Sequence, residues 1–356
     1  MIENKHVFIL GCERSGSTWL ANILDAHPGV ELFMEPFADY AVIFPDIPPR
    51  NVSVCDPNET QINGVQTGYE KLLRLKYPLG YRFGRSLNWK RLDAWIIQWV
   101  KRIDGRLHRP LPLAVQRYDL LNLHTSKIPV QFQVKKWKKP QLEATKDLRL
   151  CFKTGLIAHA FANPLFLIAI RHPGAQIGSI QTLFSKNSLG ELRRSLETFI
   201  DDIRNQPRFD TYTALMDRFA DANDPDILLI LWWLIHYEML FRDLKDQRLT
   251  FLPVFHEDIS ETPAHVASAI FDFIGLDLTP EVHTYLERSS SAERSRPVQS
   301  NVDTFRNSSH YYKERIGAVD PELNRKIREI TGFHFHSGRM EPPVHAYLER
   351  FDEFKI

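Results

Sequence analysis

The feature that most constrains how this chain can fold is the segment GCERSGST at residues 11–18. An apolar strand pattern at residues 7–10 precedes it, a helical pattern at residues 17–26 follows, and residues 30–33 read as a second strand. A glycine turn between a strand and a helix surrounds a phosphate with backbone N–H groups and the positive end of the helix dipole. This order predicts an α/β fold with a P-loop-type parallel β-sheet flanked by helices.

The loop departs from the nucleotide-binding frame G-x-x-x-x-G-K-[ST] at one position, where Ser17 stands instead of lysine. A nucleoside triphosphatase also needs an acidic residue at a strand end to hold magnesium, yet the strand pattern at residues 165–170 is followed by Arg171. A positioned cation such as Arg14 can replace a metal when the transferred group bears little charge, as a sulfuryl group does. The alternative interpretation is a glycine turn that only links strand and helix.

A second basic cluster begins with Arg171. Ser179 lies eight residues further on, in the next predicted helix. A guanidinium fork and a hydroxyl donor placed in this way can bind a second phosphate together. Both residues also have a structural interpretation, because Arg171 can pair with a carboxylate and Ser179 can be a small residue at a helix crossing.

Together, the two clusters resemble those of the sulfotransferase family that uses 3′-phosphoadenosine-5′-phosphosulfate (PAPS). The loop resembles the family's R-S-G-[ST]-T motif for the 5′-phosphosulfate, and Arg171 with Ser179 resembles its 3′-phosphate element. The motifs are most similar to those of tyrosylprotein and carbohydrate sulfotransferases. The resemblance implies PAPS as co-substrate, 3′-phosphoadenosine 5′-phosphate (PAP) as product, and no metal. The residues that it assigns to nucleotide binding are Arg14, Ser15, Gly16, Ser17, Thr18, Arg171 and Ser179.

The resemblance also implies two catalytic residues. Glu35 lies at the distance from the loop at which tyrosylprotein-type enzymes carry a catalytic glutamate, so we expect it to take the proton of the acceptor hydroxyl as general base. Lys153 resembles the lysine that faces the sulfuryl bridge, where an ammonium offsets charge on the leaving oxygen. Cytosolic small-molecule enzymes carry a catalytic histidine where this chain has Gly155, which favours Glu35 as the base. The alternatives are a carboxylate paired with an arginine or capping a turn, and a surface lysine.

The rest of the chain fits a single sulfotransferase domain over residues 1–356. Residues 45–146 are rich in Pro, Arg, Lys and Trp without strand alternation, and they are predicted to form a largely helical insertion that contributes to acceptor binding. Thr262 is expected to cap a helix that Gly275 ends. Further strands are predicted at residues 148–152, 165–170 and 249–255, and helices at residues 175–184, 189–203, 211–220, 227–244 and 262–274.

Composition argues against several other classes of protein. A net charge of +1 gives no global attraction for nucleic acid or for an anionic membrane, and no apolar run is long enough to span a bilayer. Three cysteines without metal-ligand spacing predict neither a disulfide framework nor a metal site, and they indicate a cytoplasmic protein.

The sequence therefore predicts an enzyme that transfers a sulfuryl group from PAPS to an acceptor hydroxyl by in-line displacement. A carbohydrate, such as a glycan, or a related metabolite is the favoured acceptor. Two alternatives stay open: a P-loop phosphotransferase that uses ATP, and a non-catalytic nucleotide-binding relative. The missing loop lysine and strand-end aspartate count against the first, and the presence of Arg14, Glu35 and Lys153 counts against the second.

Overall fold

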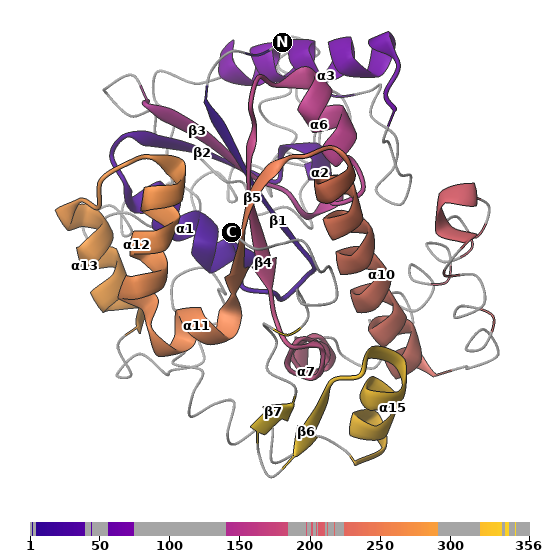
Figure 1. The fold of residues 1–356 in the computed structure, drawn as a ribbon. Coiled ribbons are helices and arrows are strands. Elements are labelled where there is room, and N and C mark those ends of the chain that lie inside the picture. The colour runs from indigo at the N-terminus through magenta and orange to yellow at the C-terminus, as the bar shows by residue number, and fades with distance from the viewer. Residues whose placement is uncertain are drawn as a thin grey trace, which may run out of the picture. The chain divides into compact units, whose positions relative to one another are not determined.

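The computed structural model describes residues 5–39, 56–74, 140–183, 224–290 and 321–336, together with a few shorter pieces and single residues. At the centre of this part is a five-stranded sheet in the order β2-β3-β1-β4-β5, in which all neighbouring strands are parallel (Figure 1). The predicted parallel α/β sheet is confirmed. The strands are β1 (His6–Gly11), β2 (Val30–Met34), β3 (Leu142–Lys146), β4 (Leu165–Ile170) and β5 (Thr250–Phe255).

Helices cover both faces of the sheet, which explains why β1 is buried along its whole length. Val7 and Ile9 point to one face and pack in a core with residues of α1, α12 and α13. Phe8 points to the opposite face, where its ring contacts Phe161 and Phe166 and where α6 and α10 lie (Figure 1). The bounds of these helices are α1 (Ser17–Ala26), α6 (Thr154–Ala160), α10 (Pro225–Asp246), α12 (Pro263–Ile274) and α13 (Pro280–Ser290).

All five strands end at the same edge of the sheet, because they are parallel. The residues that follow β1, β2, β3 and β4 are the glycine loop, Glu35, Asp147 and Arg171, and β5 is followed by His256. The chain crosses over β1 when it passes from β3 through α6 to β4, so the strand order changes direction beside β1. In open α/β sheets, ligands bind outside the carboxyl ends of the strands at such a switch point.

The strand predicted at residues 148–152 is wrong, because the third strand of the sequence is β3, and residues Leu148–Leu150 form a short 3-10 turn. The sequence of β3 is LEATK, which lacks an apolar run, yet all five residues are buried. Its polar side chains have partners inside the protein. The Thr145 hydroxyl lies 2.6 Å from the hydroxyl of Tyr69, and Glu143 lies 3.6 Å from Nδ1 of His6. A buried strand that contains polar residues cannot be recognised by hydrophobicity.

The predicted insertion at residues 45–146 extends too far, because β3 at its end belongs to the sheet. Within the insertion, α3 (Glu59–Arg74) packs Tyr69 against the rings of His6 and Phe161. The chain divides into two compact units, one formed by Leu72–Lys138 and the other by the remaining residues. Apart from the end of α3, the unit formed by Leu72–Lys138 lies outside the described residues.

The helices predicted at residues 17–26, 175–184, 227–244 and 262–274 are confirmed as α1, α7 (Pro173–Leu183), α10 and α12. Gly275 ends α12 with a φ of +66°, as expected of a helix-ending glycine. Thr262 occupies the N-cap position of α12 as predicted, but its hydroxyl makes no capping hydrogen bond and donates instead to the carbonyl of Asp258 at 3.3 Å. The helices predicted at residues 189–203 and 211–220 lie almost wholly outside the described residues.

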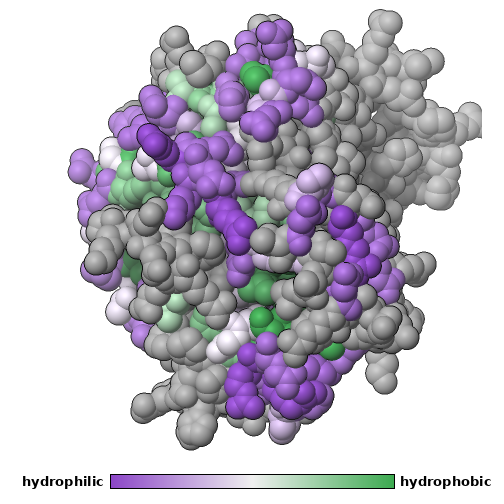
Figure 2. Space-filling model, turned by 45° about the vertical axis from the view of Figure 1, so that its right-hand side comes forward, coloured by the Kyte–Doolittle hydropathy of each residue, from purple (hydrophilic) through white to green (hydrophobic). Residues whose placement is uncertain are grey.

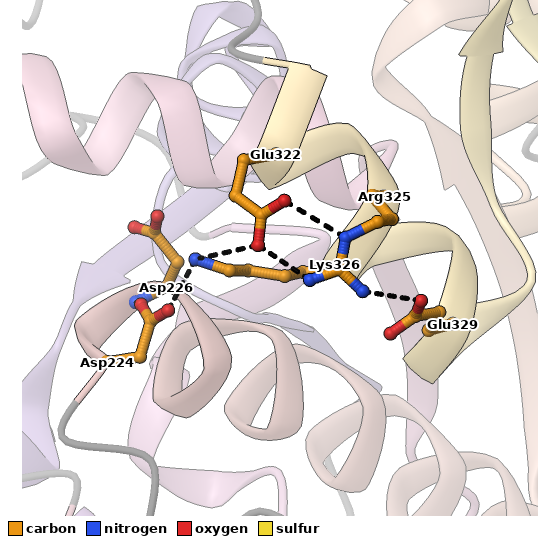
Figure 3. Close-up of polar contacts among 6 residues, drawn as sticks. All are labelled: Asp224, Asp226, Glu322, Arg325, Lys326 and Glu329. Carbon is orange, nitrogen blue, oxygen red and sulfur yellow. Dashed lines mark hydrogen bonds and ion pairs between the residues drawn. The ribbon is translucent and has the colours of Figure 1, made fainter.

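The helix α15 (Pro321–Thr331) packs against α10, and one ion pair joins it to the residue that caps the start of α10 (Figure 3). Lys326 forms an ion pair with Asp224, the residue that caps the N-terminus of α10. Arg325 bridges Glu322 and Glu329 on the exposed side of α15, with nitrogen–oxygen distances of 2.6 Å to each. The pairs of Arg325 are exposed and screened by water, so α15 depends mainly on its buried apolar residues Leu323, Ile327 and Ile330.

No described helix is both long enough and apolar enough to cross a lipid bilayer. On the face drawn in Figure 2, hydrophilic residues cover most of the described surface, and hydrophobic residues appear as small separate patches.

Candidate active site

The glycine loop after β1 has the backbone geometry of an anion-binding turn. Gly11 and Gly16 have φ values of +146° and +97°, which favour glycine, and Arg14 between them has a φ of +67°. A Cβ atom at Gly11 would lie 2.5 Å from the carbonyl oxygen of Ala169, so a side chain cannot fit there. Gly16 occupies the N-cap of α1 and has no side chain to accept the first N–H groups of the helix. These groups can therefore serve a bound anion.

The structure brings together three residues that the sequence assigned to two different phosphate sites. Nε of Arg14 donates to the hydroxyl of Ser179 at 3.2 Å, and Nη1 of Arg171 donates to the backbone carbonyl of Arg14 at 3.0 Å. Arg171 and Ser179 are each only 8% exposed, whereas Arg14 is exposed. The sequence interpretation treated the two phosphate sites as separate, but their residues contact each other. Two neighbouring guanidinium groups repel, and an anion bound to both would offset that repulsion.

Three aromatic side chains of α10 hold the loop and the end of β4 in place, and sequence reasoning did not assign them this part. Nε1 of Trp233 donates to the carbonyl of Arg171 at 3.0 Å, and Nε1 of Trp232 donates to the Glu13 carboxylate at 3.1 Å. The Tyr237 hydroxyl donates to the carbonyl of Ala169 at 2.7 Å and accepts the N–H group of Cys12 at 3.3 Å. Burial raises the pKa of Tyr237 well above its usual value, so its hydroxyl keeps the proton that it donates.

Glu35 stands directly after β2 with a φ of +46°, which is unusual for a residue with a side chain. Its carboxylate pairs with the ammonium of Lys146, the last residue of β3, whose side chain is 3% exposed while that of Glu35 is 40% exposed. The backbone N–H of Glu35 also donates to the carbonyl of Lys146 at 2.6 Å. The sequence analysis gave an ion pair with an arginine as the alternative role of Glu35. In the structure Glu35 pairs with Lys146 instead, a residue that the sequence analysis did not single out. Strained backbone of this kind is concentrated at functional sites.

Lys153 lies at the N-cap of α6 and is 1% exposed, which excludes the alternative of a surface lysine. The sulfur of Cys151, two residues earlier, accepts the N–H group of Gly11 at 3.4 Å, so this segment packs against the start of the glycine loop. The hydroxyl of the next residue, Thr154, donates to the carboxyl of Asp243 on α10 at 3.4 Å. Burial raises the pKa of Asp243 to about 8.

His256 is a further residue at this edge that sequence reasoning missed. It begins α11 (His256–Glu261), it is 7% exposed, and a Cβ atom at Gly16 would lie 2.5 Å from its Nδ1. The neighbouring Glu257 accepts the N–H group of His172 at 3.0 Å, while Nδ1 of His172 accepts the N–H group of Gly174 and so caps α7. The sequence signal for His256 is its position directly after the predicted strand at residues 249–255.

The five parallel strands and the glycine loop at their common edge define the class of the protein as an α/β protein with an open parallel sheet. A family model described as Sulfotransferase family matches residues 6–280, which is more than half of the chain. The chain therefore belongs to the sulfotransferase family and is a transferase. Among the described residues, no group of three or more His, Cys, Asp or Glu side chains is placed to hold a metal ion.

The structure is similar to several solved sulfotransferases. The sulfotransferase domain from the curacin biosynthetic pathway shares 16% identity and a TM-score of 0.40, over 93% of this chain and 98% of that chain. The sulfotransferase domain of the Synechococcus PCC 7002 olefin synthase shares 18% identity and a TM-score of 0.35, over 93% and 90%. Mouse sulfotransferase SULT7A1 complexed with PAP shares 13% identity and a TM-score of 0.39, over 92% and 82%. No curated protein sequence matches the chain.

Proposed function

We propose that this sulfotransferase transfers a sulfuryl group from PAPS to the hydroxyl of an acceptor. The observation that carries the proposal is the hydrogen-bonded cluster of Arg14, Arg171 and Ser179 beside the N-terminus of α1. The 3′-phosphate and the 5′-phosphosulfate of PAPS are attached to one ribose, so the groups that bind them must lie close together. Two guanidinium groups, a hydroxyl and a helix N-terminus fit a nucleotide that carries anionic groups at both its 3′ and its 5′ position.

In this proposal the loop residues bind the 5′-phosphosulfate and the residues after β4 bind the 3′-phosphate. The N–H groups and hydroxyls of residues 15–18 (Ser15, Gly16, Ser17 and Thr18) face the phosphosulfate with Arg14. Arg171 and Ser179 hold the 3′-phosphate, the group that distinguishes PAPS from ATP. This assignment requires Arg14 to exchange its contact with Ser179 for a contact with the nucleotide.

Glu35 takes the proton of the acceptor hydroxyl as the new oxygen–sulfur bond forms and the bond to the phosphate oxygen breaks. The ammonium of Lys146 holds the carboxylate in orientation, which supports this role because a fixed base reacts without reorganisation. Lys153 offsets the charge that develops on the leaving PAP. Adjacent strands are spaced about 4.8 Å apart, so Glu35 after β2 lies about two strand spacings from the loop after β1. This distance leaves room for an acceptor between the base and the sulfuryl group.

The acceptor that we favour is a carbohydrate, such as a glycan, or a related metabolite, and we assign its recognition to the insertion within residues 45–146. Surface excursions from a conserved type of scaffold usually carry specificity. We also place the protein in the cytoplasm, because Cys12 and Cys151 are buried free thiols, which suit a reducing compartment.

Nucleotide preference tests the donor assignment. PAP should raise the melting temperature of the protein, because a ligand at about 100 times its Kd adds about 2.7 kcal/mol to the free energy of unfolding. Mg-ATP, which lacks a 3′-phosphate, should raise it far less. A larger shift with Mg-ATP than with PAP would favour the phosphotransferase alternative and overturn the proposal.

The base is tested with Glu35→Gln, because glutamine keeps an oxygen acceptor for Lys146 but cannot take a proton at neutral pH. Transfer of labelled sulfate from PAPS to a set of sugar and metabolite hydroxyls should be lost in this variant, while the PAP-induced shift in melting temperature should be retained. The matched control is Glu287→Gln, which changes an exposed glutamate on α13 and should transfer like the wild type. Unchanged transfer by the Glu35→Gln variant would remove Glu35 from the mechanism.

A further inference from the structure

His256 is packed against the loop that would bind the phosphosulfate. Its ring lies so close to Gly16 that a Cβ atom there would be 2.5 Å from Nδ1. The backbone of His256 is fixed at the junction of β5 and α11, and its carbonyl accepts the Ser260 hydroxyl at 2.7 Å. The imidazole is therefore held at the N-terminus of α1, where the proposed anion binds.

The charges that act on His256 come from the residues proposed to hold the nucleotide. Burial, Arg171 and Arg14 together lower the pKa of His256 well below its usual value. The other titratable side chains on the helices packed here are Glu257, Asp258 and Glu261 on α11, His265 and Asp272 on α12, and Asp25 on α1. With two guanidinium groups nearby and little water, the imidazole is neutral in the absence of an anion.

A bound nucleotide would favour the protonated form of His256. PAP brings negative charge to both guanidinium groups and to the helix N-terminus, so the field that disfavours imidazolium becomes weaker or changes sign. By linkage, a group whose proton affinity rises on binding takes up a proton from solvent, and the nucleotide binds more tightly as the pH falls. Gly16 supports this coupling, because its lack of a side chain lets the ring approach the backbone that contacts the phosphate.

We propose that His256 is a further residue of the donor site and takes up a proton from solvent when the bisphosphate nucleotide binds. This inference rests on the proposed function, since it requires the anion to bind between Arg14, Arg171 and the loop. The neutral imidazole becomes imidazolium, and no other bond is made or broken. The enzyme would then hold PAPS and PAP more tightly in mildly acidic solution than in alkaline solution.

The test is isothermal titration calorimetry of PAP binding to the full chain at about pH 6, near the ordinary pKa of histidine, in two buffers of different ionisation enthalpy. The buffer dependence of the binding enthalpy gives the number of protons taken up. The wild type should take up more protons than His256→Gln, with a difference approaching about one proton per site. His265→Gln, which changes an exposed histidine on α12, is the matched control and should behave like the wild type.

Protons that belong to the phosphates of PAP cancel in the comparison, because the same ligand is used throughout. If His256→Gln does not fold, His256→Asn takes its place with a shorter amide. Equal proton uptake by the wild type and the folded variant would overturn the inference while leaving PAP binding, and hence the proposed function, intact. Failure of the wild type to bind PAP would instead overturn the proposed function.

Discussion

Substituting Gly16 by alanine should destabilise the protein through two separate effects that the structure lets us add. Gly16 has a φ of +97°, where a residue with a Cβ atom costs about 1–2 kcal/mol. The new Cβ atom would also lie 2.5 Å from Nδ1 of the buried His256, and overpacking of this kind costs about 1–3 kcal/mol. The two effects together predict a loss of about 2–5 kcal/mol in the free energy of unfolding.

Two other glycines separate these effects. Gly275 has a φ of +66°, but the nearest atom to a Cβ there is the flexible end of Lys5 at 3.0 Å, so Gly275→Ala should lose about 1–2 kcal/mol from the backbone alone. Gly178 lies inside α7, and a Cβ there meets nothing within 4 Å. Gly178→Ala should therefore stabilise the helix by about 0.5–1 kcal/mol.

The assay is urea unfolding followed by tryptophan fluorescence for each variant, with binding of PAP measured on the folded protein. The double variant Gly16→Ala with His256→Ala should recover the part of the loss that comes from the ring contact but not the backbone part. The reasoning is refuted if Gly16→Ala unfolds at the wild-type urea concentration, or if removing the ring recovers nothing.

Three further predictions concern the side chains around the loop. Tyr237→Phe should lower the free energy of unfolding by about 1–3 kcal/mol, measured by urea unfolding, because it leaves the buried Ala169 carbonyl without its hydroxyl donor. Lys146→Met should change that free energy by less than about 1 kcal/mol, because the Glu35 carboxylate is 40% exposed and stays hydrated, but should lower the turnover number at least about tenfold in a transfer assay. Asp243 has a pKa raised to about 8, so the native state keeps a proton that the unfolded chain has already released. Wild-type stability should therefore fall as the pH rises from about 4 to about 8, and Asp243→Asn, compared by urea unfolding across that range, should lose less, by on the order of a few kcal/mol.

The glycine loop between β1 and α1 could be predicted from sequence because its signals are local. Gly11 and Gly16 stand where the backbone needs a positive φ, and the flanking strand and helix are apolar segments of ordinary period. Arg171 was recognisable for the same reason, since it directly follows the apolar strand β4. Parallel pairing then requires both segments to meet at one edge of the sheet.

The partners of these residues could not be predicted, because they come from distant parts of the chain. Trp233 donates a hydrogen bond to the carbonyl of Arg171, which lies 62 residues earlier in the chain. Nothing in the sequence around a tryptophan on a buried helix indicates such a contact. Lys146 ends β3, a strand that contains too many polar residues to be predicted from hydrophobicity. Its pairing with Glu35 depends on β2 and β3 being neighbours in the sheet, which the sequence does not show. The position of a polar group at a strand end is thus predictable, but its partner depends on the tertiary fold.

In the proposed function, Arg171 and Ser179 recognise a phosphate on the 3′ side of an adenosine nucleotide. The affinities of adenosine 3′,5′-bisphosphate and adenosine 5′-monophosphate, measured by calorimetry for the wild type and for Arg171→Met, test it most directly. The wild type should prefer the bisphosphate by about 10- to 100-fold, since a charge-assisted hydrogen bond contributes about 1.5–3 kcal/mol, and the variant should lose most of this preference. Equal affinity of the wild type for the two nucleotides would rule out recognition of a 3′-phosphate by Arg171 and Ser179.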